Sequence, residues 1–385
     1  MNNLGQLPGE IISLIIDDIP DRDLYTCALI NKVFYATANP LLWRAPALEN
    51  ETKAHAFINC IMQARHPVGQ YIRSLKLYSK WTDADLLVLT LYAGQLEELC
   101  IFAGDWLTDQ SLVYLAKDCP HLKTVYLHCP LITHQSIHAL GQECKQLTEL
   151  GLHHCSNLSP DIFASLMACP LKELYLCLDN NNTATSSFYE EEDRVMVDDE
   201  TMKDLKRFDQ LTHLTLDNID PDWVSQLLLT STECWAPLSS LVLKNIFGMG
   251  DAPLVTFLQS HHDLTELQLS CVDLTDVTLD VIATMGFPHL TRLNLSSNPS
   301  ITAQGVRHVV MQCPFLVSVE LVLCHLLANE FPEATGDACI GHNFWTIFTV
   351  GSEVQKVVHR LDQHAINTIR LGSTTSQQIT MDHTE

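Results

Sequence analysis

Histidine and cysteine are the residues of this chain whose spacing could support metal chemistry. His134 and His138 lie four residues apart in a predicted helix, which would place both imidazoles on one helix face. The consecutive residues His153, His154 and Cys155 form a second group of potential ligands. No second cysteine or carboxylate follows either group at a ligand spacing, and each group fits its place in a repeated pattern. We therefore expect no metal site.

The sequence motifs of common enzyme classes are also missing. The chain contains no G-x-S-x-G, no G-x-x-x-x-G-K-[ST] and no H-E-x-x-H. Gly336 and Gly341 have the spacing of a phosphate-binding loop, but His342 stands where the lysine is required. We expect no catalytic residue, no cofactor and no enzyme activity.

The elements that position these side chains are predicted by a recurring pattern, L-x-x-L-x-L. Most copies begin about 25 residues apart, and a period of roughly 20–29 residues with this apolar spacing is the signature of leucine-rich repeats. The end of each copy alternates apolar and polar residues, as a half-buried strand does. The copies begin at Ile72, Leu96, Leu122, Leu147, Leu171, Leu211, Leu238, Leu264, Leu290 and Leu316.

A second apolar set with helical spacing follows several strands, as in Leu107–Pro120 and Ile301–Pro314. A strand and a helix cannot cover their own apolar faces, whereas stacked copies can. We predict an α/β leucine-rich-repeat solenoid, with a curved parallel sheet on the concave side and helices on the convex side, preceded by a small all-α module. Helix N-caps are expected at Thr108, Thr133, Ser159, Thr275 and Thr302.

Composition limits the partners and the compartment. The chain has 46 acidic and 22 basic residues and a net charge of −24, which argues against nucleic acid or an anionic membrane as the main partner. The N-terminal residues lack a basic segment and include Glu10, so we expect no secretory signal, and no apolar run is long enough for a membrane span. Several cysteines recur in phase with the repeat, as small buried apolar residues would. We expect a cytoplasmic or nuclear protein.

The stretch 7–43 predicts three short helices. Pro8 suits the first turn of a helix, a stripe of isoleucines follows, and Pro20 ends it. Helices this short are marginal alone, and a module of about 40 residues seldom has a sufficient core. A partner that buries the remaining apolar surface would stabilise such a module.

This stretch resembles an F-box, although Phe34 stands where many F-boxes have tryptophan. Together with the repeats it makes the chain similar to the F-box/leucine-rich-repeat family, in particular fungal members, which are substrate receptors of Skp–cullin–F-box ubiquitin ligases. The alternative is a helical cap of the solenoid that binds no adaptor. The resemblance rests on Leu7-Pro8, Glu10-Ile11, Ile15, Asp23-Leu24, Cys27-Ala28, Ile30, Phe34 and Leu42-Trp43.

The resemblance implies a non-catalytic receptor that binds a Skp-type adaptor and, through it, a cullin scaffold, while the repeats bind a protein substrate. A repeat scaffold that acts outside any ubiquitin ligase is the alternative, and the sequence does not identify the substrate. The residues implied to bind the adaptor are Leu7, Pro8, Ile11, Ile15, Leu24 and Leu42.

Outward strand positions form the predicted substrate surface on the concave face. The early copies place aromatic and histidine residues there, whereas the later copies place polar residues. Exposed aromatic residues in neighbouring strands are typical of protein interfaces, although they could instead pack on each other or under the C-terminal segment. The predicted substrate-binding residues are Tyr78, Phe102, Tyr126, His128, His153 and Tyr175.

We predict four regions: an F-box at 1–45, a helical linker or cap at 46–71, about ten repeats at 72–325, and a terminal region at 326–385. An acidic insertion at 179–196 reads as a mobile loop, either functional or a tolerated surface insertion. In the terminal region we expect a helix over 352–365, a repeat-like segment at Ile366–Leu371 that caps the solenoid, and disorder from about Gly372.

Overall fold

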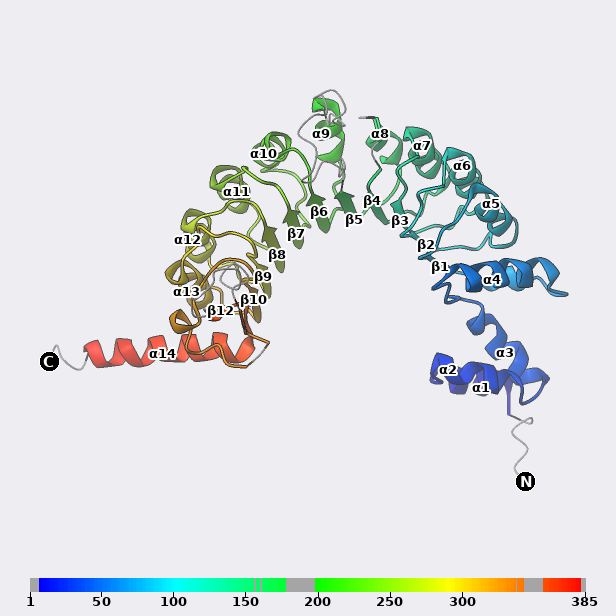
Figure 1. Ribbon diagram of the computed structural model, residues 1–385, viewed down its shortest axis with the longest axis horizontal. Coiled ribbons are helices and arrows are strands. Elements are labelled where there is room, and N and C mark those ends of the chain that lie inside the picture. The colour runs from blue at the N-terminus through cyan, green and yellow to red at the C-terminus, as the bar shows by residue number, and fades with distance from the viewer. Residues whose placement is uncertain are drawn as a thin grey trace, which may run out of the picture. The chain divides into compact units, whose positions relative to one another are not determined.

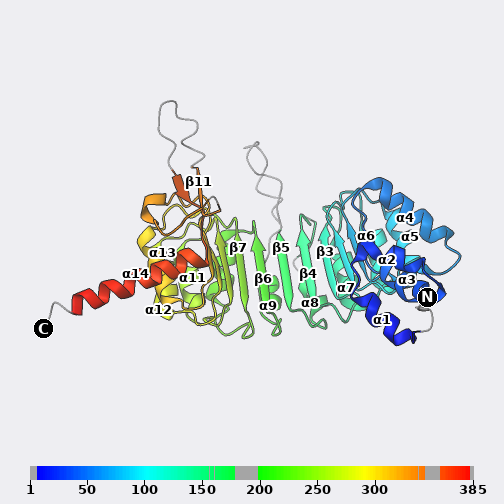
Figure 2. The same cartoon turned by 90° about the horizontal axis from the view of Figure 1, so that it is seen from below.

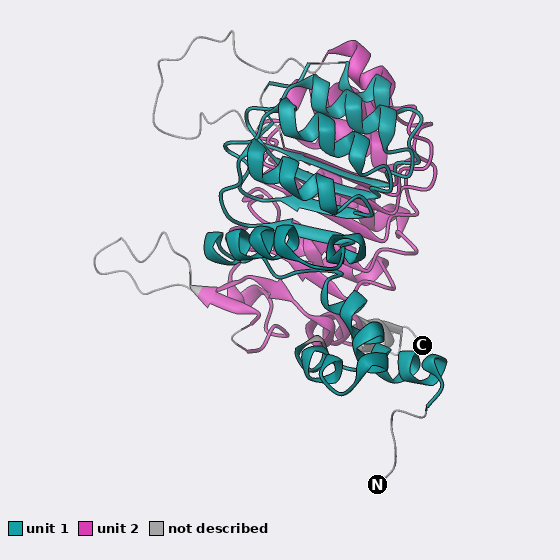
Figure 3. Cartoon of the chain, turned by 90° about the vertical axis from the view of Figure 1, so that its right-hand side faces the viewer, with its two compact units in different colours: residues 1–171, 180–196 teal, residues 172–179, 197–385 magenta. Residues whose placement is uncertain are grey.

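The computed structural model describes residues 7–155, 157–159, 161–177, 198–336, 338–342 and 356–381. The chain divides into two compact units, and the boundary at Leu171 falls inside the predicted repeat region (Figure 3). Unit 1 comprises residues 1–171 and 180–196, and unit 2 comprises residues 172–179 and 197–385. The predicted acidic loop at 179–196 lies outside the described residues.

Unit 1 begins with the three short helices that the sequence predicts. Asn31 caps the third helix, because its Oδ1 accepts hydrogen bonds from the backbone N–H groups of Val33 (2.8 Å) and Phe34 (3.0 Å). A small apolar core lies between the helices and consists of Ile12, Ile16, Leu24, Ala28, Phe34 and Ala38. The helices are α1 (Gly9–Asp17), α2 (Asp21–Ala28) and α3 (Lys32–Leu42).

A linker then joins this module to the first strand. The predicted linker helix is present as α4 (Glu51–Gln63), and a 3-10 turn, η2 (Val68–Tyr71), follows it. The backbone carbonyl of Arg44 accepts hydrogen bonds from the N–H groups of Arg73 (2.9 Å) and Ser74 (3.0 Å). The end of the three-helix module is therefore bonded directly to the start of the sheet.

The repeats of unit 1 alternate strands and helices. The strands pair in parallel with their sequence neighbours, and the helices lie on one side of them (Figure 1). The strands are β1 (Ser74–Leu77), β2 (Glu98–Ile101), β3 (Thr124–His128) and β4 (Glu149–His153). The helices are α5 (Asp83–Tyr92), α6 (Asp109–Asp118), α7 (His134–Glu143) and α8 (Ile162–Leu166).

Unit 2 continues the same alternation, and its neighbouring strands β6 and β7 lie side by side (Figure 2). Its parallel strands are β5 (Glu173–Cys177), β6 (His213–Asp217), β7 (Ser240–Lys244), β8 (Glu266–Ser270), β9 (Arg292–Asn294) and β10 (Ser318–Glu320). Its repeat helices are α9 (Asp199–Leu205), α10 (Pro221–Leu229), α11 (Asp251–Leu258), α12 (Asp276–Met285) and α13 (Ala303–Gln312). Both units thus have the predicted fold of a leucine-rich-repeat solenoid.

A carboxylate connects neighbouring repeats at the helix N-termini. In unit 1, Asp109 at the start of α6 accepts hydrogen bonds from the N–H (2.9 Å) and the hydroxyl (2.7 Å) of Thr133, the N-cap of α7. In unit 2, Asp251 makes the same two bonds to Thr275, the N-cap of α12. The predicted caps at Thr108, Thr133, Thr275 and Thr302 are confirmed, whereas Asp161 and not Ser159 precedes α8.

The cysteines that recur in phase are buried, as the sequence predicts. Cys119 and Cys144 at the ends of α6 and α7 are free thiols with almost no exposed surface. Burial, with a smaller contribution from Asp118, raises the pKa of the Cys119 thiol to about 12. Such thiols pack as small apolar side chains and are poor nucleophiles.

The terminal region differs from the prediction. The expected helix over 352–365 is wrong, because this segment contains strands β12 (Lys356–Val358) and β13 (Arg360–Leu361). The β-branched pair Val357–Val358 favours a strand, and β12 pairs with β11 (Ile340–His342). Strand β13 pairs antiparallel with β10 and so closes that edge of the unit 2 sheet.

The last described element is helix α14 (Gln363–Met381), which includes Ile366–Leu371, the segment predicted as the repeat-like cap of the solenoid. Its helical backbone also continues beyond Gly372, where we expected disorder. Arg370 on this helix donates hydrogen bonds to the carbonyls of Val310 (3.0 Å) and Leu316 (3.4 Å), and therefore fixes α14 to the last repeat. Within the described part of the chain, no helix combines the length and apolar character needed to cross a membrane.

Candidate functional site

Helix α1 is apolar on two sides. Ile12 and Ile16 are 0% and 1% exposed and pack into the core of the three-helix module. Ile11, Leu14 and Ile15 lie on the other side and are 43%, 64% and 40% exposed. Since residues three and four apart share a helix face, these three side chains form a continuous apolar stripe, which we call the α1 stripe.

Four of the six residues implied to bind an adaptor are exposed in this structure. Leu7 and Pro8 are exposed just before α1, next in sequence to the α1 stripe residues Ile11 and Ile15. Leu42 is half-buried against the module core.

Leu24 differs from the expectation, because it is only 3% exposed and belongs to the core. Helix α2 turns Leu24 and Ala28 inward, one turn apart, and leaves Tyr25 and Leu29 exposed. Sequence reasoning missed Leu14, Tyr25 and Leu29, although their helical spacing could have indicated them.

On unit 1, we call the face of the strands that points away from the helices the sheet face. Tyr78 and Phe102 follow β1 and β2, whose last residues, Leu77 and Ile101, are register partners. Their rings stack with centroids 4.7 Å apart and planes 8° apart, and both side chains are exposed. The two residues therefore present one flat aromatic surface to solvent.

Tyr126 on β3 lies across the neighbouring strand, β4. It is the register partner of Gly151, and its ring occupies the space that a Cβ on Gly151 would need. Tyr126 is half-buried in this position. Glycine at 151 thus lets the aromatic side chain lie flat against β4.

Three histidines meet at the ends of β3 and β4. His128 and His153 are register partners, with ring centroids 4.8 Å apart. The ring of His154 lies 4.6 Å from that of His128 and 4.2 Å from that of His153. The ligand nitrogens of the three all lie within 4.8 Å of one another, so the cluster could hold a metal ion.

The surroundings of His128 favour its neutral imidazole. Burial lowers the pKa of His128, the nearby His154 lowers it further, and Asp105 partly opposes the shift. In the sequence, His128 is predicted as a substrate-binding residue, whereas His153 is grouped as a potential metal ligand only with its chain neighbours His154 and Cys155. The repeat period was the available signal, because residues 25 apart occupy adjacent strands.

Tyr175 belongs to unit 2, whereas the other five predicted substrate-binding residues belong to unit 1. Its hydroxyl donates a hydrogen bond to the Asp217 carboxylate on the neighbouring strand (3.4 Å). Burial is the main cause that raises the pKa of Tyr175 above its ordinary value. It is half-buried and fixed within its own sheet.

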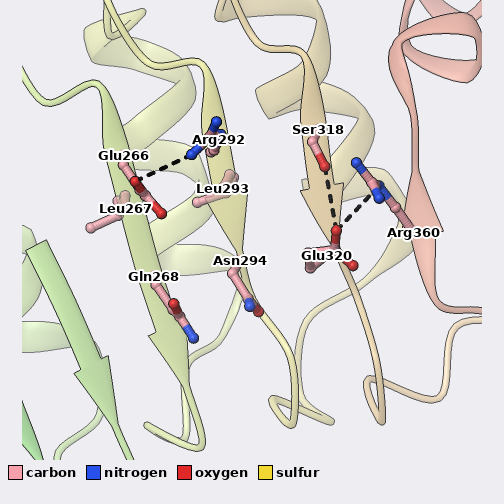
Figure 4. A pocket seen from close by; sticks show the side chains of 9 residues that line it. All are labelled: Glu266, Leu267, Gln268, Arg292, Leu293, Asn294, Ser318, Glu320 and Arg360. Atoms are coloured by element: carbon pink, nitrogen blue, oxygen red, sulfur yellow. Dashed lines mark hydrogen bonds and ion pairs between the residues drawn. The ribbon is translucent and has the colours of Figure 1, made fainter. Parts of the chain in front are cut away.

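The strand face of unit 2 carries a polar hollow of about 360 Å³ over β8, β9 and β10 (Figure 4). Ion pairs cross it, with Arg292 3.8 Å from Glu266 and Arg360 3.2 Å from Glu320. The arginines therefore have carboxylate partners. The lining residues are Glu266, Leu267, Gln268, Arg292, Leu293, Asn294, Ser318, Glu320 and Arg360.

Comparison with known proteins adds only a likeness of fold. No protein-family model and no curated protein matches this chain. A solved structure that is similar is the crystal structure of the Rad7 and Elc1 complex in yeast, at 16% identity and a TM-score of 0.47, covering 82% of this chain and 69% of that chain. The described architecture is that of a leucine-rich-repeat solenoid, with a three-helix module at the start of unit 1.

Proposed function

We propose that this chain is a non-catalytic substrate receptor of a Skp–cullin–F-box ubiquitin ligase. In this proposal the three-helix module binds a Skp-type adaptor, and the sheet face of unit 1 binds a protein substrate. The observation that carries the proposal is the α1 stripe, since a helix that is apolar on both sides has one side left for a partner.

The energetics favour an apolar docking partner. Fully burying a leucine or isoleucine side chain contributes about 1.5–3 kcal/mol. Ile11, Leu14 and Ile15 are 43%, 64% and 40% exposed, so docking all three would add about one and a half times that amount before the entropy cost of association. The motif positions Leu7, Pro8, Ile11 and Ile15, which the F-box resemblance assigns to the adaptor, lie on or next to this stripe.

The proposed mechanism is positioning, with no chemistry by this chain and no cofactor. The N–H groups of Arg73 and Ser74 donate hydrogen bonds to the Arg44 carbonyl, so the end of the module is bonded directly to the start of the first strand. A substrate held on the repeats of unit 1 would then remain near the ligase, whose other subunits transfer ubiquitin, and the gain would come from effective concentration. Such a receptor would act in the cytoplasm, the nucleus or both.

The substrate surface we propose is the aromatic pair of unit 1. Tyr78 and Phe102 are exposed and stacked, and rigid aromatic side chains of this kind dominate many protein interfaces. Trp106 in the loop after β2 is also exposed, with the Lys80 ammonium 5.8 Å from its ring centroid. An extended apolar or aromatic segment of a protein fits this surface.

Co-purification with a Skp-type adaptor tests the proposal. The Ile11→Glu/Ile15→Glu variant puts two charges on the exposed α1 stripe, and we expect it to lose the adaptor. Leu91→Glu is the matched control, because Leu91 is 75% exposed on α5 of the same unit, and this variant should retain the adaptor. Circular dichroism spectra of all three proteins should coincide.

Three outcomes would contradict the proposal. If the folded wild-type chain does not bind the adaptor, or if the Ile11→Glu/Ile15→Glu variant binds it as well as the wild type, the α1 stripe is not the docking surface. If the adaptor binds but no cullin joins the complex, the chain is a repeat scaffold that acts outside a ligase.

A further inference from the structure

We propose that His128, His153 and His154 form a binding site for a divalent transition-metal ion such as Zn²⁺. The site lies at the ends of β3 and β4 on the sheet face of unit 1. This inference is independent of adaptor binding.

The backbone explains how two consecutive histidines reach the same point. Successive side chains of a regular strand point to opposite faces, which would separate His153 from His154. The chain leaves β4 at His154 with a φ of 51°, in the left-handed region, and the alternation ends there. Their rings consequently lie 4.2 Å apart.

The same left-handed conformation occurs at Asn218 and Asn245, the residues after β6 and β7. The turn is therefore a property of the repeat and does not itself indicate a ligand. This repeat is distinguished by its histidines: His154 occupies the turn, and His153 and its register partner His128 occupy the strand positions beside it.

The distances are close to those of a coordination sphere. Imidazole nitrogens bind Zn²⁺ at about 2.0–2.1 Å, so two ligands of a tetrahedral ion are roughly 3.3 Å apart. The ligand nitrogens of the cluster lie within 4.8 Å of one another. Because the three side chains are only half-buried, rotations of the rings can close this difference.

The chemistry of the ligands suits a borderline metal ion. Neutral imidazole is a common ligand of zinc, copper and nickel. Three histidines leave a fourth coordination position for water or for a side chain of a bound protein.

A nearby carboxylate would partly offset the charge of the ion. The N–H of Gly104 donates a hydrogen bond to the carbonyl of His128 (3.0 Å), which keeps the loop that contains Asp105 beside the cluster. Asp105 already acts on His128 electrostatically. Removing this charge should weaken binding less than removing a ligand.

Metal titration of the untagged, full-length chain tests the site. The protein is first stripped with a chelator, and Zn²⁺ is then titrated in competition with a chromophoric chelator. We expect one tight equivalent, with affinity reduced more than about tenfold in His128→Gln/His153→Gln and in His154→Asn. Asparagine is chosen at 154 because it tolerates the left-handed backbone.

The matched control is the second histidine pair of the same unit. His134 and His138 on α7 have ring centroids 5.5 Å apart and offer two imidazoles without a third. His134→Gln/His138→Gln should bind Zn²⁺ as the wild type does. Zn²⁺ should also raise the melting temperature of the wild type and the control, and not that of the site variants.

The proposal is overturned if the wild type and the site variants bind Zn²⁺ equally, or if only the control variant loses binding. Cobalt provides a second readout, because Co²⁺ at this site should give the intense visible absorption of a tetrahedral complex. A folded wild type without that absorption and without tight Zn²⁺ binding would equally reject the site.

Discussion

The strand faces of the two units share one backbone pattern and differ in their side chains. In unit 1 the exposed positions beside β1 and β2 hold the stacked pair Tyr78 and Phe102. In unit 2 the corresponding surface holds cross-strand ion pairs such as Arg360 with Glu320. The inward leucines are buried in both units. The comparison teaches that the repeat fold constrains only the inward positions, so the outward positions are available for binding.

The largest effect is expected from truncating the inward leucines of the strands, and it tests whether these leucines contribute equally to stability in the two units. Leu127→Ala on β3 of unit 1 and Leu243→Ala on β7 of unit 2 each remove a fully buried side chain. We expect each to lower the free energy of unfolding by about 2–5 kcal/mol, from lost burial and the cavity left behind. Urea unfolding measures both. A loss below 1 kcal/mol in one unit only would break the equivalence of the two inward rows.

The second test concerns the carboxylates between repeats. Burial by itself would raise the pKa of Asp109, but hydrogen bonds from Ser136 and Thr133 outweigh burial and hold the pKa below its ordinary value. In the same way, burial would raise the pKa of Asp251, but hydrogen bonds from Thr278 and Thr275 outweigh burial and hold that pKa below its ordinary value. Replacing either aspartate with alanine should cost about 1–3 kcal/mol, because buried donors lose their acceptor.

The sign of the pH dependence follows from these lowered values. A carboxyl group whose folded pKa lies below the ordinary value of about 3.9 stabilises the fold above that pH. This stabilisation is lost as the pH falls through the folded pKa. The Asp109→Ala and Asp251→Ala variants should therefore lose less stability on acidification than the wild type. Urea unfolding midpoints at neutral and acidic pH measure this. A larger fall in midpoint on acidification for the variants than for the wild type would contradict the prediction.

A smaller effect is expected for the aromatic pair of unit 1. A double-mutant cycle on Tyr78→Ala and Phe102→Ala should give a coupling of about 0.5–1.5 kcal/mol, the range found for stacked rings. Each single variant should leave the fold intact, because both side chains are exposed. Binding of a substrate, once identified, should fall far more than stability does. If binding free energy and folding stability fall by equal amounts, the aromatic pair contributes to folding rather than to substrate recognition.

The smallest effect is expected for the ion pair of unit 2. Arg360→Ala should change the free energy of unfolding by about 0–1 kcal/mol, because Arg360 and Glu320 are both partly exposed. The difference should shrink further at high salt. Thermal denaturation at two salt concentrations checks this, and a large salt-independent loss would show that the unit 2 face contributes to the fold.

The sequence predicted the repeats well because their signal is local and redundant. The leucine period located the strands, and single threonines such as Thr133 and Thr275 located helix starts, since an N-cap bonds to its own next residues. The terminal region was harder. Val357 and Val358 lie in a strand because β12 pairs with β11, a contact between segments that no local pattern specifies.

The candidate sites show the same division. Helical spacing identified the apolar residues of α1, but the choice of Ile12 and Ile16 for the core and Ile11 and Ile15 for the surface depends on how three helices pack. Likewise Leu24 matched a motif and is nevertheless buried, because α2 turns that side toward the other two helices.

By itself the sequence determined the strand and helix order, the inward leucine rows and the buried cysteines, because burial requires apolar side chains at fixed spacing. The tertiary structure decided which side of α1 stays exposed, and it brought His128 beside His153 and His154. These features arise from contacts between residues far apart in the chain or at a turn of special backbone conformation. The energy of such contacts depends on the folded arrangement of neighbours, which a local sequence pattern does not contain.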